Sequence, residues 1–116
     1  MPTKAVTVTV TEDTTDVYQV VYTIRVSDEP VRLGSGDDGI EWTLDSADWS
    51  FTKDHHGDSS GVYVKRAGGK FNDKKGTRKK HKWERISPGG RYSYTISVTK
   101  NTNEDVVVTW DPTIMN

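Results

Sequence analysis

The sequence predicts an all-β protein, an antiparallel β-sandwich of immunoglobulin-like type with roughly seven to nine strands. Apolar and polar residues alternate with a period of two in several segments, and no window of ten or more residues has the apolar spacing of a helix. Turn residues recur at intervals typical of a sandwich. A small closed β-barrel is the alternative. A length of 116 residues is that of one domain, so residues 1–116 are expected to form a single sandwich.

The N-terminal part is expected to form a β-hairpin. Val6, Val8 and Val10 alternate with threonines, and residues 12–15 have the composition of a turn. The next strand is expected to have one apolar face, formed by Tyr18, Val20, Tyr22, Ile24 and Val26.

Shorter strands are expected in the middle of the chain. Pro30 cannot donate to a central ladder, so the residues that follow it favour a sheet edge. The predicted elements, in order, are an edge strand at 31–33, a glycine-rich loop at 34–39, a strand at 40–44, a strand around Trp49 and Phe51, a polar loop at 53–61 and a strand at 62–64.

The C-terminal half contains one segment that resists assignment to a strand. Residues 67–78 are rich in glycine and lysine and lack periodic apolar residues, which predicts a mobile hairpin loop. Residues 79–86 are expected to form a strand with Trp83 facing inward and Lys80 and Lys82 facing outward. Strands at 92–99 and 106–110 complete a hairpin, which Asp111 and Pro112 end.

Most aromatic residues occupy the apolar phase of their strands. Core packing is therefore expected for Tyr18, Tyr22, Trp42, Tyr92, Tyr94 and Trp110. Tyr63 is out of phase with Val62 and Val64 and is expected to be exposed. Exposed flat rings on a sandwich would be typical of a carbohydrate-binding module, which is one alternative function.

Charge is distributed unevenly along the chain. The whole chain has a net charge of -1, yet ten of its sixteen Lys and Arg residues lie between Lys65 and Arg85, where Asp73 and Glu84 are the only acids. Cations interleaved with aromatic residues are able to bind phosphate or sulfate groups. The predicted binding residues are Lys65, Arg66, Lys70, Lys74, Lys75, Arg78, Lys79, Lys80 and Lys82. The simpler interpretation is a solvated, charged hairpin.

Other polar clusters are explained more simply as turns and loops than as metal or catalytic sites. Residues 54–58 contain two adjacent histidines, but only an irregular loop would bring them together on one metal. The acids at 37–38 and 45–48 lack the spacing of a known calcium loop and suit ordinary turns. Residues 57–61 are similar to the serine loop of trypsin-like proteases over five positions only, without a base and acid that can be placed beside it.

The sequence therefore predicts a non-enzymatic binding module that contacts an acidic partner, a polyanion or an acidic protein surface, through residues 65–85. The alternatives are a structural protein that assembles head to tail through the acidic and basic loops, and the carbohydrate-binding module. No cofactor, metal or membrane span is expected. The absence of cysteine favours a reducing compartment, so a cytoplasmic location is expected.

Overall fold

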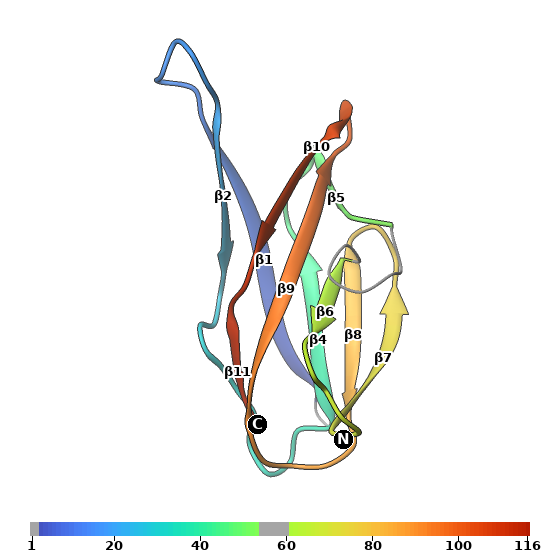
Figure 1. Cartoon of the computed structure of the whole chain (residues 1–116). Coiled ribbons are helices and arrows are strands. Elements are labelled where there is room, and N and C mark those ends of the chain that lie inside the picture. The colour runs from blue at the N-terminus through green and yellow to red at the C-terminus, as the bar shows by residue number, and fades with distance from the viewer. Residues whose placement is uncertain (1–2, 54–60) are drawn as a thin grey trace.

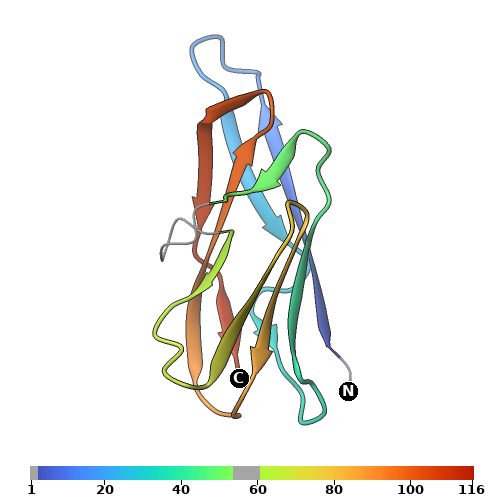
Figure 2. The same cartoon turned by 90° about the vertical axis from the view of Figure 1, so that its right-hand side faces the viewer.

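The computed structural model describes residues 3–53 and 61–116, apart from the side chain of Lys75, and confirms the predicted β-sandwich (Figure 1, Figure 2). The described residues form strands in two sheets that pack face to face. The sheets do not close on each other, so the barrel alternative is wrong. The described part of the chain contains no helix that could cross a membrane.

The first sheet has five strands. Their order is β2 (Val21–Val26), β1 (Lys4–Asp13), β4 (Gly39–Leu44), β8 (Lys80–Arg85) and β7 (Phe71–Gly76). The pair β1 and β4 is parallel, with Val6 opposite Trp42, and the other pairs are antiparallel. The parallel pair arises because the chain visits the second sheet, at β3 (Val31–Arg32), between β2 and β4.

The second sheet is built around β9 (Arg91–Lys100). Along one side of β9 lie β5 (Trp49–Phe51) and β6 (Val62–Val64), and along the other lie β10 (Asn103–Trp110) and β11 (Thr113–Met115). β11 also pairs in parallel with β3. Both sheets are therefore mixed, whereas an antiparallel arrangement was expected throughout.

Four of these strands are the halves of two longer, interrupted strands: β10 with β11, and β5 with β6. β10 and β11 follow β9 in one register, and Pro112 between them still accepts a bond of 3.0 Å from the Tyr94 amide. Thr52 and Gly61 both bond to Ser97, at 3.0 and 2.8 Å, so β5 and β6 continue each other along β9. If each interrupted strand is counted once, the eleven described strands become nine, the upper end of the predicted range.

The core lies between the sheets and follows the predicted alternation. Val6, Val8 and Ile24 from the first sheet face Ile96 and Val98 from the second, and all are buried. Trp42 and Tyr94 are fully buried, with ring centroids 5.0 Å apart. Trp83 is 5% exposed, so its predicted inward orientation is confirmed. Tyr22 and Tyr92 are half-buried and pack against this core.

Two residues that were expected in the core are exposed. Tyr18 is 94% exposed because it lies in the loop 14–20, which extends beyond the end of the sandwich (Figure 1, Figure 2). No second sheet faces Tyr18 there. The apolar residues of this alternating segment are therefore covered only from Tyr22 onward. Trp110 is 37% exposed because β10 is an edge strand of its sheet.

The segment 67–78 is not a simple loop. Residues 71–76 form β7, which pairs with β8 from Phe71 opposite Arg85 to Gly76 opposite His81. Phe71 is 5% exposed and packs edge-on against Tyr92, with ring centroids 5.4 Å apart. Burial of one aromatic residue and hydrogen bonding to the free edge of β8 are thus enough to form a strand, despite its charged side chains. Its predicted mobility remains a prediction.

Tyr63 also differs from expectation. It is half-buried rather than exposed, and its ring lies edge-on to Trp83 with centroids 6.2 Å apart. β6 is at the edge of its sheet, so an out-of-phase ring can reach past the edge to the opposite sheet.

Candidate binding groove

A polar groove lies on the second sheet, on the side of β5 and β9 that faces away from the core. It has a volume of about 530 Å³. Ser50 and Thr99 are opposite each other in the ladder of β5 and β9, and both line the groove. The local sequence explains their position, because Ser50 lies between the inward-facing Trp49 and Phe51 in an extended strand.

The floor of the groove is held by a short chain of hydrogen bonds. Arg78 Nε donates to Ser50 Oγ at 3.2 Å, and Ser50 Oγ donates to Asn101 Oδ1 at 2.6 Å. Asn101 Nδ2 in turn donates to the carbonyl of Ala47 at 3.3 Å. The hydroxyls of Thr52 and Thr99 are 3.0 Å apart. Because these groups fix one another, the groove presents its polar atoms in one arrangement.

A smaller hollow of about 140 Å³ adjoins the groove. Both are lined by Phe51, Thr52, Lys53 and Arg78, so the two cations stand where the groove and the hollow meet. His81 lines the hollow, and its Nε2 lies 2.8 Å from Asp73 Oδ1. Phe51 is buried at 3% exposure, so it offers no flat surface for stacking.

Lys100, a further cation in the lining of the groove, is already engaged. Lys100 Nζ lies 3.0 Å from Glu12 Oε1 and 5.8 Å from the ring centroid of Tyr22. The hydrogen bond to Glu12 raises the pKa of Lys100 above its ordinary value. Glu104 is the one acid in the described lining of the groove. An anionic ligand would therefore be attracted to the side of Lys53 and Arg78.

The predicted basic segment does not form one patch. Lys65, Arg66 and Lys70 lie at one end of β7, and Arg78, Lys79 and Lys80 lie beyond its other end. A strand of this length separates the two groups by about 20 Å. Pairing in a hairpin therefore spreads the cations along the molecule instead of gathering them.

Several of the predicted binding residues have partners within the chain. Lys65 pairs with Asp111 at 3.1 Å, and Lys74 pairs with Glu84 at 3.7 Å. Lys70 Nζ donates to Ser87 Oγ at 3.4 Å and to the Pro88 carbonyl at 3.3 Å. Lys79 Nζ donates to the carbonyls of Ser46 and Trp49, and so stabilises the loop that leads into β5.

The remaining predicted residues differ in their surroundings. Arg66 and Lys80 are exposed, and Lys82 is half-buried beside Glu41 on the outer face of the first sheet. Lys75 belongs to β7, and its side chain lies outside the described part of the structure. Of the predicted residues whose side chains are described, only Arg78 lines the groove.

Sequence reasoning did not identify Lys53 or the hydroxyl floor. The alternation of hydroxyl and apolar residues along 92–99 was visible, but it indicates only which side chains face away from the core. That Ser50, Thr99 and Asn101 meet Arg78 depends on the pairing of β5 with β9 and on the β7–β8 turn.

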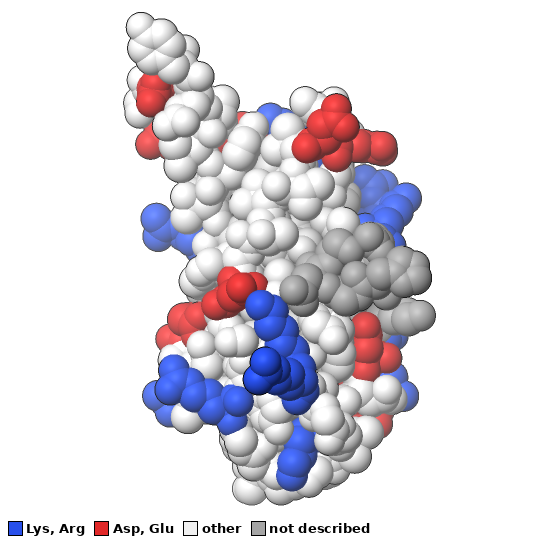
Figure 3. Space-filling model, in the orientation of Figure 1, with Lys and Arg blue, Asp and Glu red and all other residues white. Residues whose placement is uncertain are grey.

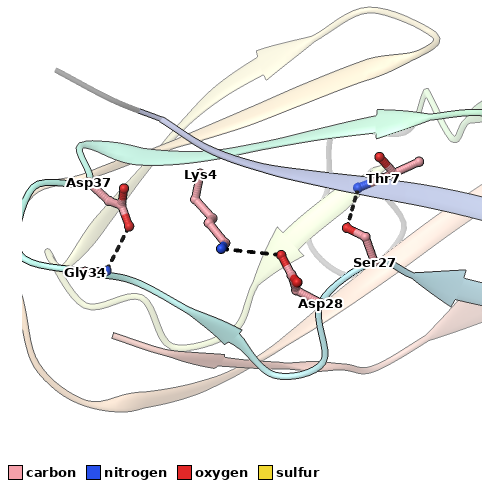
Figure 4. A network of polar contacts seen from close by, with 6 residues as sticks. All are labelled: Lys4, Thr7, Ser27, Asp28, Gly34 and Asp37. Carbon is pink, nitrogen blue, oxygen red and sulfur yellow. Dashed lines mark hydrogen bonds and ion pairs between the residues drawn. The ribbon is translucent and has the colours of Figure 1, made fainter.

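The acidic loops are separate and partly engaged. Residues 37–38 precede β4 and residues 45–48 follow it, so the two loops lie at opposite ends of that strand. Asp37 Oδ2 accepts a bond of 2.8 Å from the Gly34 amide (Figure 4), and Asp38 Oδ1 accepts one of 2.8 Å from Thr3 Oγ1. The described residues contain no group of three His, Asp or Glu side chains able to hold a metal. Residues 54–58 and most of 57–61 lie outside the described residues.

Comparison with protein-family models and with curated proteins finds no match for this chain.

Proposed function

We propose that the chain is a non-enzymatic binding module that holds an acidic group of a partner macromolecule between Lys53 and Arg78. The observation that carries the proposal is the state of the Arg78 side chain. Its Nε is held by Ser50, while no partner is found for its two terminal nitrogens among the described residues, and Arg78 lines both the groove and the hollow. A guanidinium fixed at one nitrogen keeps a fork of donors for a carboxylate, sulfate or phosphate.

The rest of the groove favours an acidic chain over a nucleic acid. Hydroxyls of Ser50, Thr52 and Thr99 can donate to or accept from hydroxyl or amide groups that follow the acidic one. Single-stranded nucleic acids depend on aromatic platforms for stacking. Phe51 is the one aromatic in the described lining, and it is buried. Acidic polysaccharides and acidic peptides fit these groups better.

The carbohydrate-binding alternative has less support. Tyr18 and Trp110 are the aromatic residues that are exposed in the described part, and they belong to different elements. Flat rings that stack on one sugar chain need to share a face. A cytoplasmic location and an immunoglobulin-like classification remain predictions, the former supported by the absence of cysteine.

The test is binding to heparin fragments and to polyglutamate, measured by fluorescence anisotropy in low and high salt. The double variant Lys53→Gln/Arg78→Gln should bind about tenfold more weakly, since each lost charge-assisted bond contributes about 1 kcal/mol or more. The control Arg25→Gln/Arg32→Gln removes two exposed cations elsewhere and produces the same net charge. Equal losses in both variants, or no loss in the first, would contradict a site in the groove.

A further inference from the structure

The loop between β1 and β2 is the most exposed apolar part of the described surface. We call residues 14–20 the finger. Val17 is 86% exposed and Tyr18 is 94% exposed, and Val20 and Val21 at its base are about half exposed. The finger extends beyond the end of the sandwich in both views (Figure 1, Figure 2). Large apolar side chains gathered at one projecting point are typical of an interaction surface.

The finger is held in one shape by its own acids. Asp13 Oδ1 accepts bonds from the Thr15 amide at 3.0 Å and from Thr15 Oγ1 at 2.7 Å. Asp16 Oδ1 accepts a bond of 2.8 Å from the Tyr18 amide. These local bonds restrict the loop, so it should lose less conformational freedom on binding than an unconstrained loop would.

The end of the molecule that carries the finger is acidic. Three segments lie there: 13–20, 45–48 and 101–105. They contain six acids and no lysine or arginine, the acids being Asp13, Asp16, Asp45, Asp48, Glu104 and Asp105. Figure 3 shows red side chains at this end, and a mixture of blue and red ones over the opposite half.

The opposite end combines cations with an exposed apolar residue. The loops 65–70 and 86–91 lie together there, because the Ile86 and Ser87 amides bond to the Lys70 carbonyl at 2.8 and 3.3 Å. These loops contain Lys65, Arg66, Lys70 and Arg91 and no acid. Ile86 is 58% exposed, and Arg66 and Arg91 are exposed. We call this surface the basic end.

The acids near the basic end are engaged within the chain. Asp28 lies 3.6 Å from Lys4 Nζ (Figure 4), and Glu29 accepts from the Thr113 amide at 3.1 and 3.2 Å. Asp37 and Asp38 accept the bonds to Gly34 and Thr3 described above. Lys65 is paired with Asp111, so the unpaired positive charge of these loops lies on Arg66 and Arg91, which are exposed and have no acidic partner among the described residues.

We propose that the finger of one copy docks on the basic end of a second copy, with Tyr18 and Val17 against Ile86 and with Asp16 facing Arg66. The apolar tip meets an apolar side chain, and the acids around the tip meet cations. The contact joins two different surfaces, so it is heterologous and extends into a chain of molecules along the long axis. None of the residues named in this contact lines the groove, although Glu104 belongs both to the groove and to the acidic end.

The size of the molecule sets the expected strength. Its two shorter dimensions are 24 and 22 Å, so an end-to-end contact covers less than the ~800 Å² per partner of a standard interface. Association is therefore expected to be weak, detectable from micromolar to millimolar concentration, and weaker in high salt because exposed charges are screened.

Sedimentation velocity over this range of concentration tests the proposal. Tyr18→Ser should weaken association about tenfold, since a buried aromatic anchor is worth more than about 1 kcal/mol at an interface. Two charge variants test the pairing: Asp16→Asn/Gln19→Lys in the finger and Arg66→Asp/Arg91→Glu at the basic end. Asn keeps the acceptor of the finger, and Asp tolerates the positive φ of 53° at Arg66.

Each charge variant alone should associate more weakly than the unaltered chain, because like charges then meet at the proposed contact: Lys at position 19 against Arg66 in the first variant, and Asp16 against Asp at position 66 in the second. An equimolar mixture of the two should associate more strongly than either alone, since in an alternating chain each of these local pairs joins opposite charges. Lys53→Gln/Arg78→Gln should assemble as the unaltered chain does, which separates this result from the groove. A chain that stays monomeric at millimolar concentration, or a mixture that associates no better than its components, would overturn the proposal. Binding of a monomeric chain to neutral lipid vesicles through Tyr18 would assign the finger to a membrane instead.

Discussion

Trp83 Nε1 donates a hydrogen bond of 2.9 Å to the main-chain carbonyl of Val62, and this bond joins the two sheets. Val62 lies opposite Ile96 on β6, an edge strand, at a position where its carbonyl points away from β9. The indole therefore supplies the donor that a further strand would otherwise provide. A core tryptophan thus closes one edge of the second sheet.

Trp83→Phe should lower the free energy of unfolding by about 1–3 kcal/mol, because the Val62 carbonyl then has no partner in a buried place. Urea denaturation followed by circular dichroism measures the change. Trp110→Phe is the matched control, since Trp110 lies at an exposed edge, and it should change stability by less than about 0.5 kcal/mol. Equal effects of the two substitutions would show that the hydrogen bond contributes nothing.

Val17→Ala and Tyr18→Ala should leave the free energy of unfolding within about 0.5 kcal/mol of the unaltered chain. Both side chains are in the finger and bury almost no surface in the monomer. Ile24→Ala on the same hairpin should cost about 2–5 kcal/mol, because Ile24 is buried between the sheets. Thermal unfolding in dilute solution makes the comparison. A large loss at Tyr18 would mean that the finger folds back onto the sandwich.

Tyr94→Phe should keep or slightly raise stability, in contrast to the usual loss on deleting a buried hydroxyl. Neither Tyr94 Oη nor Trp42 Nε1 has a partner with good hydrogen-bond geometry in the described structure, so the buried hydroxyl gains at most a weak interaction with Trp42. Chemical denaturation at neutral pH measures the effect. A loss of more than about 1 kcal/mol would reveal a partner for the hydroxyl.

Burial also raises the pKa of Tyr94 well above its ordinary value. The folded chain therefore holds this proton more tightly than the unfolded chain does. The corresponding stability is complete below the unfolded pKa of about 10 and is lost as the pH rises above it. Tyr94→Phe should reduce the alkaline decline in stability, which the same denaturation series at pH 9 to 11 would follow.

Gly76→Ala should destabilise the chain by about 1–3 kcal/mol, since the added Cβ would lie 1.9 Å from the Lys80 carbonyl oxygen. The displaced β7–β8 turn carries Arg78, so binding of an acidic ligand in the groove should weaken as well. Gly36→Ala is the control, because nothing lies within 4 Å of its Cβ. Anisotropy and denaturation on both variants make the test. Unchanged binding in a destabilised Gly76→Ala variant would separate Arg78 from the groove.

The unaltered chain should have a larger free energy of unfolding than Asp111→Asn at neutral pH, and this difference should become smaller at acid pH. The hydrogen bond from Thr95, at 2.7 Å, and the nearby Lys65 lower the pKa of Asp111 in the folded chain. Its contribution is complete above the unfolded pKa of about 3.9 and is lost as the pH falls through the lower folded pKa. The side chain is half exposed, so the difference should stay below about 1 kcal/mol. A constant difference from pH 7 to 2 would contradict this account.

The period-two alternation along the chain was enough to predict the sandwich and most of its core. Val6, Val8, Ile40, Trp42 and Leu44 are buried as their phase indicates, and Trp83 faces inward. Alternation reports which side of a strand is apolar, and in a protein with two facing sheets that side is nearly always covered. It does not report how far the opposing sheet extends. This is why Tyr18, in phase with Ile24, is nevertheless exposed.

The distribution of charge was read correctly as a feature of the sequence, but its arrangement in space depended on tertiary structure. Pairing of β7 with β8 separates Arg66 from Arg78, whereas pairing of β5 with β9 brings Lys53 and Ser50 beside Arg78. Side-chain phase along a strand is local and can be seen in the residues themselves. Which strands become neighbours depends on burial and hydrogen bonding summed over the whole chain. The groove is formed by this pairing of strands, so its residues cannot be identified from the local sequence.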